Sequence, residues 1–167
     1  MGRIIKLVLP LVLVGGVLMY MLSSPANKSL KPAPEFSGQL MDGSEFSLSD
    51  LRGDFVLLDF WGSWCPPCRK ENPKLAALYN KYGGQDFEIV SVALEKNDKG
   101  WQKAIKKDQL NWPYHILRTS RLVAADPLAL RYQVSDLPTK FLIDPKGKII
   151  SVNPSFEEIM TTLDGRG

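Results

Sequence analysis

Residues 55–71 read FVLLDFWGSWCPPCRKE and place a pair of cysteines directly after an apolar run. Residues 55–60 have the length of a strand, and their nearly continuous apolar character predicts burial on both faces of a sheet. After the cysteines, apolar residues recur at helical spacing until Gly83-Gly84 ends the pattern, as at Leu75, Leu78, Tyr79 and Tyr82. The sequence therefore predicts a strand, a turn that carries the cysteines, and a helix that starts at them.

The rest of the chain alternates strand and helix patterns. Asp42-Gly43 predicts the turn of a hairpin ahead of the first long strand, and residues 47–52 predict one helical turn before Gly53. Further strands are expected over residues 87–94, 114–117, 141–144 and 149–152. Helices are expected over 98–110, from Asp126-Pro127, and from Ser155, which forms a capping-box pattern with Glu158. This order predicts an α/β fold with a central mixed sheet flanked by helices, an N-terminal hairpin extension and a final strand hairpin.

The charge distribution argues against a nucleic-acid-binding protein. The first 34 residues contain Arg3, Lys6, Lys28 and Lys31 and no acid. The remainder has 17 Lys and Arg against 18 Asp and Glu, so the basic excess lies outside the predicted domain. A nucleic-acid-binding domain would carry that excess on its folded part.

The N-terminal segment has the pattern of a membrane anchor. Residues 7–22 carry no charge and approach the ~20 residues that a helix needs to cross a bilayer. Basic residues at its start favour a cytoplasmic N-terminus, which predicts a single-pass inner-membrane protein whose catalytic domain lies on the periplasmic side. A cleaved signal peptide, with Ser24-Pro25-Ala26 as a poor cleavage site, is the alternative.

The predicted organisation has three parts. Residues 1–22 form the transmembrane anchor or signal peptide, residues 23–34 a proline-containing linker, and residues 35–167 one α/β domain. Whether the N-terminal segment is an anchor or a cleaved signal peptide, the domain is expected in an oxidising compartment, where a thiol pair can persist as a disulfide.

The two cysteines are suited to redox chemistry. Cys65 would lie at the N-terminus of a helix, where free N–H groups and the helix dipole favour an anion. We therefore expect a Cys65 pKa below that of a free thiol, and the thiolate is the reactive form. Cys68 follows three residues later and is within reach of the first sulfur.

A structural disulfide and a metal site are the two alternative roles for the pair. A purely structural disulfide across so short a ring would contribute only about 2 kcal/mol by loop-closure arithmetic. A closed zinc site needs four ligands, and the chain has two Cys and one His, so no metal site is expected. The histidine, His115, lacks partners in the sequence and is expected to be structural or on the surface.

Residues 55–71 resemble the active-site strand and helix of the thioredoxin superfamily. Together with the N-terminal anchor, residues 35–53 and the region after Leu94, they look like its TlpA/ResA-like branch, and the resemblance covers roughly residues 35–163. It implies a thioredoxin-like fold in which Cys65 attacks a disulfide and Cys68 resolves the mixed disulfide. No cofactor is implied beyond the redox-active Cys65–Cys68 disulfide.

The resemblance also implies substrates and a substrate-binding surface. Tethered members of this branch reduce disulfides in exported proteins, including cytochrome c maturation substrates, and receive electrons from a transmembrane donor. A loop with a cis Leu137–Pro138 bond would face the cysteines, and the residues expected to bind substrate are Trp64, Pro66, Pro67, Leu137, Pro138 and Thr139. We expect a monomer that binds the membrane through its anchor and does not bind nucleic acid.

Two acids are candidates for proton transfer at Cys68. Asp59 lies within the apolar strand and matches the buried aspartate of thioredoxins, and Glu95 matches an acid common in the TlpA/ResA-like branch. Burial could raise the pKa of either carboxyl and make it a base, so the choice between them stays open at this stage.

The residues that flank the two cysteines are expected to have packing or surface roles. Of Trp61 and Trp64, one is expected in the core and the other beside the thiols, because indole carries a large apolar area. Residues 69–71 are expected on a solvated helix face.

Three rival functions remain. Copper-delivery proteins on the same fold have an anchor, two Cys and a distant His, but they place three residues between the cysteines, and this chain has two. Peroxiredoxins use a Thr-X-X-Cys motif, which this chain replaces with WCPPC. An oxidase differs from a reductase only in redox potential, which the sequence does not specify.

Overall fold

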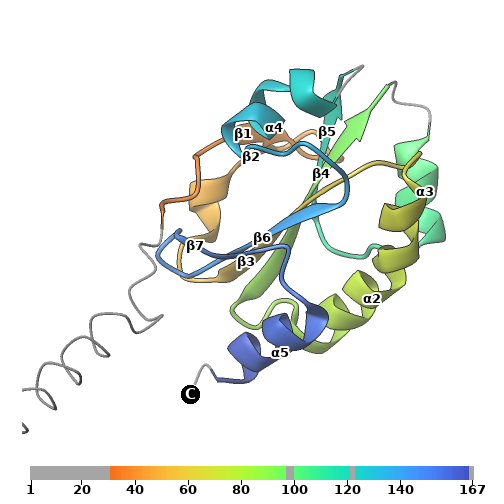
Figure 1. Cartoon of the computed structure of the whole chain (residues 1–167). Coiled ribbons are helices and arrows are strands. Elements are labelled where there is room, and N and C mark those ends of the chain that lie inside the picture. The colour runs from red at the N-terminus through yellow and green to blue at the C-terminus, as the bar shows by residue number, and fades with distance from the viewer. Residues whose placement is uncertain (1–30, 97–99, 121–122, 166–167) are drawn as a thin grey trace, which may run out of the picture. The chain divides into compact units, whose positions relative to one another are not determined.

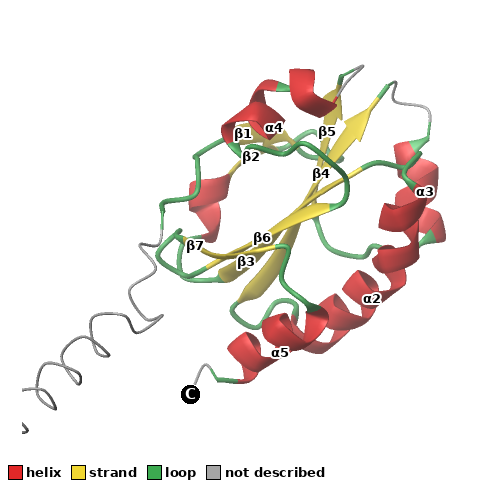
Figure 2. Ribbon diagram, viewed as in Figure 1, coloured by secondary structure: helices red, strands yellow, loops and turns green. Residues whose placement is uncertain are grey.

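A computed structural model describes residues 31–96, 100–120 and 123–165, shown in Figure 1 and coloured by secondary structure in Figure 2. The elements follow the order expected for the domain. They are β1 (Ser37–Gln39), β2 (Glu45–Ser47), the 3-10 turn η2 (Leu48–Leu51), β3 (Phe55–Trp61), α2 (Pro66–Tyr82), β4 (Phe87–Glu95), α3 (Trp101–Lys107), β5 (Tyr114–Thr119), η3 (Val123–Ala125), α4 (Pro127–Arg131), β6 (Thr139–Ile143), β7 (Ile149–Val152) and α5 (Phe156–Asp164).

The central sheet is mixed, as expected. Its five strands have the order β5-β4-β3-β6-β7, in which β3, β4 and β5 are parallel and β6 runs antiparallel to both β3 and β7. The strands β1 and β2 form a separate antiparallel hairpin, and Gly43 adopts a φ of +87° in its turn. Both the N-terminal hairpin and the final β6–β7 hairpin are therefore confirmed.

The sheet separates two apolar cores. On one face, alternate residues of β3 pack against the β1–β2 hairpin, η2 and α4, with Val56, Leu58 and Phe60 as its contribution. On the other face, Leu57 and Trp61 pack with α2, α3 and α5. Figure 2 shows these three helices on the same side of the sheet. Because strand side chains alternate between faces, β3 is buried on both sides, as its apolar run predicts.

The domain begins earlier than the sequence indicated. Pro32 forms a β-bridge with Lys148, the Ala33 N–H donates to the Gly147 carbonyl at 2.9 Å, and Ala33 is 5% exposed. Residues 31–33, expected in the linker, therefore pair with the turn between β6 and β7 and with the first residue of β7. The predicted anchor and the rest of the linker lie outside the described residues, and within the described ranges no helix is long and apolar enough to span a bilayer.

Element boundaries differ by a few residues for identifiable reasons. The helix expected over 98–110 ends at Lys107, because Gln109 adopts a left-handed φ of 57°. The strand expected to begin at Phe141 begins at Thr139, because Thr139 and Lys140 pair with Phe60 and Asp59 of β3. Lys140 thus lies in the sheet, where no sequence pattern placed it.

Candidate active site

The two cysteines lie where β3 ends and α2 begins, as expected. Cys65 is the N-cap of α2, Pro66 and Pro67 occupy its first positions, and Cys68 lies in its first turn. The sulfurs form a disulfide with the Cα atoms 5.3 Å apart, and the Cys68 N–H points at the Cys65 sulfur with an N–S distance of 3.2 Å. Prolines cost little here, because the first N–H groups of a helix have no helical partners. The helix thereby directs an N–H at the sulfur predicted to become a thiolate.

Glu95 fixes the turn that precedes Cys65. Its carboxylate accepts hydrogen bonds from the Ser63 backbone N–H at 2.5 Å and from the Ser63 hydroxyl at 2.9 Å, one to each oxygen. The Cys65 N–H closes the turn on the Gly62 carbonyl at 3.1 Å. Glu95 is only 3% exposed at the end of β4, so its interaction with Ser63 ties the cysteine-bearing turn to the central sheet. This geometry favours a positioning role for Glu95 over the base that the sequence left possible.

Replacing Glu95 by glutamine is expected to lower the free energy of unfolding by about 2–3 kcal/mol. The variant keeps the shape but removes the charge that strengthens both bonds, and it turns one acceptor into a donor aimed at Ser63. Urea unfolding of the oxidised protein, followed by far-ultraviolet circular dichroism, measures the change. Ser63→Ala is the matched control, since it removes only the hydroxyl bond and should cost about 1 kcal/mol. Equal losses in the two variants would contradict the role assigned to the charge.

The two tryptophans divide as expected. Trp61 is 1% exposed in the core, whereas Trp64, next to Cys65, is 47% exposed. The Trp64 indole N–H donates to the Leu94 carbonyl at 2.9 Å, and the Lys96 ammonium lies 5.8 Å from the centre of the Trp64 ring. A Cβ on Gly62 would lie 2.8 Å from the indole nitrogen, so glycine leaves room for this orientation. An aromatic face is thus held at the rim of the disulfide.

Asp59 is buried beneath the helix that carries the cysteines. It is 2% exposed, and it lies between Leu57 and Trp61, whose side chains share a core with both cysteines. Alternation along β3 therefore directs Asp59 to the same face of the sheet. Burial raises the pKa of Asp59 to about 7; the positive charge of Lys140 opposes this rise and the negative charge of Glu71 adds to it. A carboxyl group with a pKa near neutrality can both accept and release a proton.

Of residues 69–71, expected on a solvated helix face, Lys70 is exposed, whereas Arg69 and Glu71 are half-buried and form ion pairs. Glu71 forms an ion pair with Lys140, which is 5% exposed on β6. Arg69 forms an ion pair with Asp108, and the Asn72 amide donates to the same carboxylate at 2.7 Å. The expectation is wrong for Arg69 and Glu71 because α2 lies beside Asp108, at the end of α3, and over Lys140 of β6, and both residues offer an opposite charge.

The loop before β6 has the predicted cis Leu137–Pro138 peptide bond. The antiparallel pairing of Phe60 with Thr139 places the start of β6 beside the end of β3, from which Cys65 follows. Leu137 packs against the core that contains both cysteines, and the Thr139 hydroxyl donates to the Asp136 carbonyl at 2.6 Å. The exposed Trp64, Pro66 and Pro67 complete the set expected to bind substrate. Substrate binding at these residues stays a prediction.

His115 is built into the core. Its ring is 3% exposed, stacks on Trp112 with centroids 5.2 Å apart, and places Nε2 3.1 Å from the Leu110 carbonyl oxygen. Burial lowers the pKa of His115 to about 4, although hydrogen bonding to the backbone opposes the change. The ring is therefore neutral at physiological pH. No group of three or more metal-ligating side chains occurs within the described ranges. These contacts explain His115 as a structural residue.

Three contributors to the site were missed at the level of sequence: Ser63, Glu71 and Lys140. A serine two residues before a cysteine has no distinctive signal. Lys140 follows the Pro138-Thr139 pair in a predicted loop, and only the register with β3 shows that it lies opposite Asp59. The spacing of Cys68 and Glu71 does place them on one helix face, which was the one available signal.

Comparisons with known proteins agree with this geometry. The model of the AhpC/TSA family matches residues 30–152. Over 120 residues, the chain is 40% identical to "Thiol-disulfide oxidoreductase ResA" of Bacillus subtilis (72% of this chain, 64% of the relative) and 35% identical to ResA of Bacillus cereus (72% and 66%). The matched segment thus spans slightly less than two thirds of these curated relatives.

Solved structures give the same result. A thiol-disulfide oxidoreductase from Bacteroides fragilis matches with a TM-score of 0.72 and 32% identity, covering 80% of this chain and 98% of that one. The thioredoxin domain of a thiol-disulfide oxidoreductase from Bacteroides vulgatus matches with a TM-score of 0.71 and 30% identity, covering 80% and 94%. The thioredoxin-like fold expected from residues 55–71 is confirmed.

Proposed function

The chain belongs to the AhpC/TSA family, and from this membership together with the site we propose that it is a thiol–disulfide oxidoreductase acting through Cys65 and Cys68. One observation carries the proposal: the cysteines form a disulfide at the start of α2, where the Cys68 N–H is directed at the Cys65 sulfur. A donor in that position stabilises a thiolate on Cys65 in the reduced protein.

The reaction follows from the positions of the groups. The Cys65 thiolate attacks one sulfur of a substrate disulfide, and the other substrate sulfur leaves as a thiolate that takes up a proton. Cys68 then loses its proton to the Asp59 carboxylate, and its thiolate attacks the Cys65 sulfur. The bond between Cys65 and the substrate breaks, and the second substrate sulfur leaves with the electron pair. Two electrons pass to the substrate and the enzyme is left with the Cys65–Cys68 disulfide.

The roles of the two acids follow from their partners. Both oxygens of Glu95 are engaged by Ser63, whereas Asp59 lies on the face of the sheet that α2 covers and has a pKa of about 7. We therefore assign proton exchange at Cys68 to Asp59 and the positioning of the Cys65 turn to Glu95.

We further propose that the domain works outside the cytoplasm as a reductase of disulfides in exported proteins, with cytochrome c maturation as one such process. The uncharged segment at residues 7–22, preceded by basic residues, supports an inner-membrane anchor with the domain on the periplasmic side. A reductase in that compartment requires electrons from a transmembrane donor. Its substrates would be extended chains containing a disulfide, docking beside Trp64 and the Leu137–Pro138 loop.

The proposal predicts a reversible disulfide with a reducing potential. We expect a value nearer to the roughly −270 mV of thioredoxin than to the roughly −120 mV of strong oxidants. Equilibration with defined thiol–disulfide buffers, followed by alkylation and mass spectrometry, gives the ratio of dithiol to disulfide. A cysteine pair that stays oxidised in all buffers would refute the proposed oxidoreductase activity. A potential near −120 mV would indicate that the protein is an oxidase and not a reductase.

A peroxidase is the other activity to test within this family. The site carries a CPPC motif in place of Thr-X-X-Cys and buries both sulfurs, which are 3% and 1% exposed. We expect the reduced protein to consume hydrogen peroxide far more slowly than it reduces a protein disulfide. Comparable rates would favour the peroxidase instead.

A further inference from the structure

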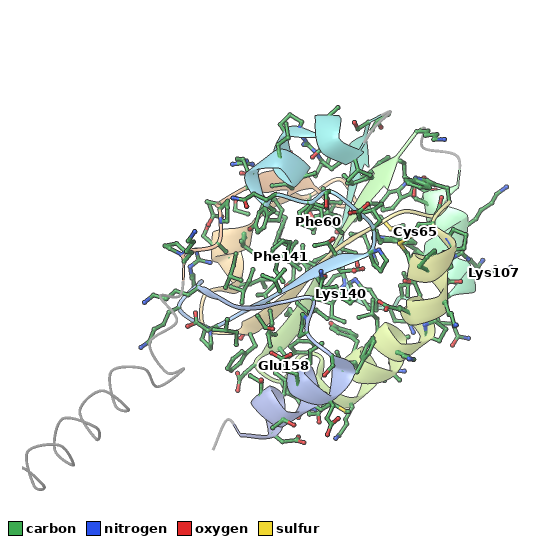
Figure 3. All side chains as sticks on the ribbon, viewed as in Figure 1. Phe60, Cys65, Lys107, Lys140, Phe141 and Glu158 are labelled. Atoms are coloured by element: carbon green, nitrogen blue, oxygen red, sulfur yellow. A yellow bond between two sulfur atoms is a disulfide. The ribbon has the colours of Figure 1, made fainter. Side chains whose placement is uncertain are left out.

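Lys140 lies on the same face of the sheet as the cysteines. Its neighbour Leu142 belongs to the core that contains Cys65 and Cys68, and side chains two residues apart on a strand share a face. In the pairing of β3 with β6, Lys140 lies directly opposite Asp59. Figure 3 labels both Cys65, at the start of α2, and Lys140, on β6. A lysine and an aspartate are thus neighbours beneath the helix that carries the thiols.

The ammonium group of Lys140 is buried and held by the helix above it. Lys140 is 5% exposed, and its Nζ forms an ion pair with Glu71, whose side chain is 37% exposed at the rim. The Lys140 backbone N–H donates to the Asn153 side chain at 2.8 Å, which anchors this part of β6 to the end of β7. A buried ammonium is costly unless it is paired, so Glu71 accounts for the position of the charge.

The other neighbours of Asp59 are uncharged. On β4, Ser91 lies opposite Asp59 and accepts a hydrogen bond from the Trp112 indole at 3.0 Å. His115, beside Ser91 on β5, is neutral at physiological pH, and α5 contributes Ile159 and Leu163 to this core. Of the titratable groups on α2, Glu71 is the one whose charge acts on Asp59, and the Cys68 thiol joins it on reduction. The charge that acts on Asp59 therefore comes from Lys140 and Glu71.

We propose that Lys140 is a positioning residue for disulfide exchange: held by Glu71, its ammonium group favours the ionised form of Asp59, so that a large fraction of Asp59 can accept the proton of Cys68 at neutral pH. This inference rests on the proposed oxidoreductase activity. In the resolving step, the proton moves from the Cys68 sulfur to the Asp59 carboxylate, and the Cys68 thiolate then displaces the substrate sulfur from Cys65. Without the ammonium, burial and the Glu71 carboxylate both favour the protonated acid, which cannot act as a base.

The first test measures the titration of the Asp59 carboxyl group in the absence of disulfide exchange. In the oxidised protein, carbon-detected NMR of labelled aspartate follows the titration of the Asp59 carboxyl. We expect Lys140→Met to raise its midpoint by roughly one pH unit or more, and Glu71→Gln to lower it. Lys140→Arg keeps the charge and should stay close to the wild-type midpoint. Unchanged midpoints in the Met and Gln variants would overturn the proposal.

The second test separates electrostatics from structure by the pH dependence of resolution. The rate at which Cys68 releases a preformed mixed disulfide on Cys65 is measured by stopped flow from pH 5 to 10. We expect Lys140→Met to be roughly fivefold slower than the wild type at pH 7 and to approach its rate near pH 9, as follows when the pKa of Asp59 rises by one unit from about 7. A loss of equal size at every pH would show a merely structural role and overturn the proposal. Lys140→Arg should restore the wild-type profile.

The two ideas can fail separately. If the wild-type protein forms no mixed disulfide, the oxidoreductase is refuted, while the Asp59 midpoints still report whether Lys140 and Glu71 control its charge. If the wild type exchanges disulfides and Lys140→Met shifts neither the midpoint nor the profile, only the role of Lys140 is refuted.

Discussion

Replacing Cys65 by serine is expected to abolish reduction of a protein disulfide, with a loss of at least about 10³-fold in rate. Cys65 is the N-cap of α2, and its sulfur receives the Cys68 N–H at 3.2 Å, so it is the sulfur whose thiolate the helix stabilises. A serine hydroxyl is far less acidic and cannot form a disulfide. Insulin reduction, followed by turbidity, measures the loss.

Cys68→Ser is the matched variant, because it removes the other sulfur of the same pair. It should still form the first mixed disulfide but be unable to resolve it, so substrates accumulate on Cys65. Mass spectrometry of complexes isolated after acid quenching and thiol blocking identifies the trapped partners. If Cys65→Ser trapped substrates as well as Cys68→Ser does, the assigned roles would be reversed.

Asp59→Asn is expected to stabilise the oxidised protein at pH 8 by up to about 4 kcal/mol relative to pH 3.5. Burial raises the pKa of Asp59 from 3.8 to about 7, with Lys140 opposing and Glu71 adding to the rise. Between these values the folded protein holds a proton that the unfolded chain releases. The folded state binds more protons there, so the wild-type free energy of unfolding falls as the pH rises through that window. Asparagine does not ionise, so the free energy of unfolding of the variant does not fall through this cause as the pH rises.

The measurement is urea unfolding of both proteins between pH 3.5 and 8. The difference between them should grow from about pH 4 to pH 7 and then level off, whereas contributions of other acids cancel in the comparison. A difference that stayed flat over this range would mean that Asp59 titrates normally. The same variant should slow resolution of the mixed disulfide by Cys68 at neutral pH. Unfolding thus reports the role of Asp59 in stability, and the rate of resolution reports its role in disulfide exchange.

Much of the fold could be predicted because its signals are local. The apolar run before the cysteines, the helical repeat after them and Gly43 in the hairpin turn each report on a few neighbouring residues. The redox pair was predictable for the same reason, since both sulfurs lie within one turn of one helix. The cis Leu137–Pro138 bond came from resemblance, because local preference alone favours trans.

What the sequence could not predict depends on pairing between distant segments. Lys140 follows a predicted loop, and only its register opposite Asp59 brings it beneath α2. The ion pair of Arg69 with Asp108 joins two helices whose relative placement no periodicity contains. For the same reason, the sequence could not decide whether Asp59 or Glu95 exchanges a proton with Cys68. That choice depends on the contact of Glu95 with the distant Ser63, which donates a hydrogen bond to each of its carboxylate oxygens.

The pairing of residues 31–33 with the turn before β7 determines where the polypeptide enters the domain. That turn also accepts a hydrogen bond from the Gly53 N–H at the Pro145 carbonyl, just before β3 starts, whereas Cys65 follows the last residue of β3. Entry and reactive sulfur are thus separated by the length of a seven-residue strand, about 20 Å. A partner that docks at the disulfide therefore approaches the end of the domain that is remote from Lys31.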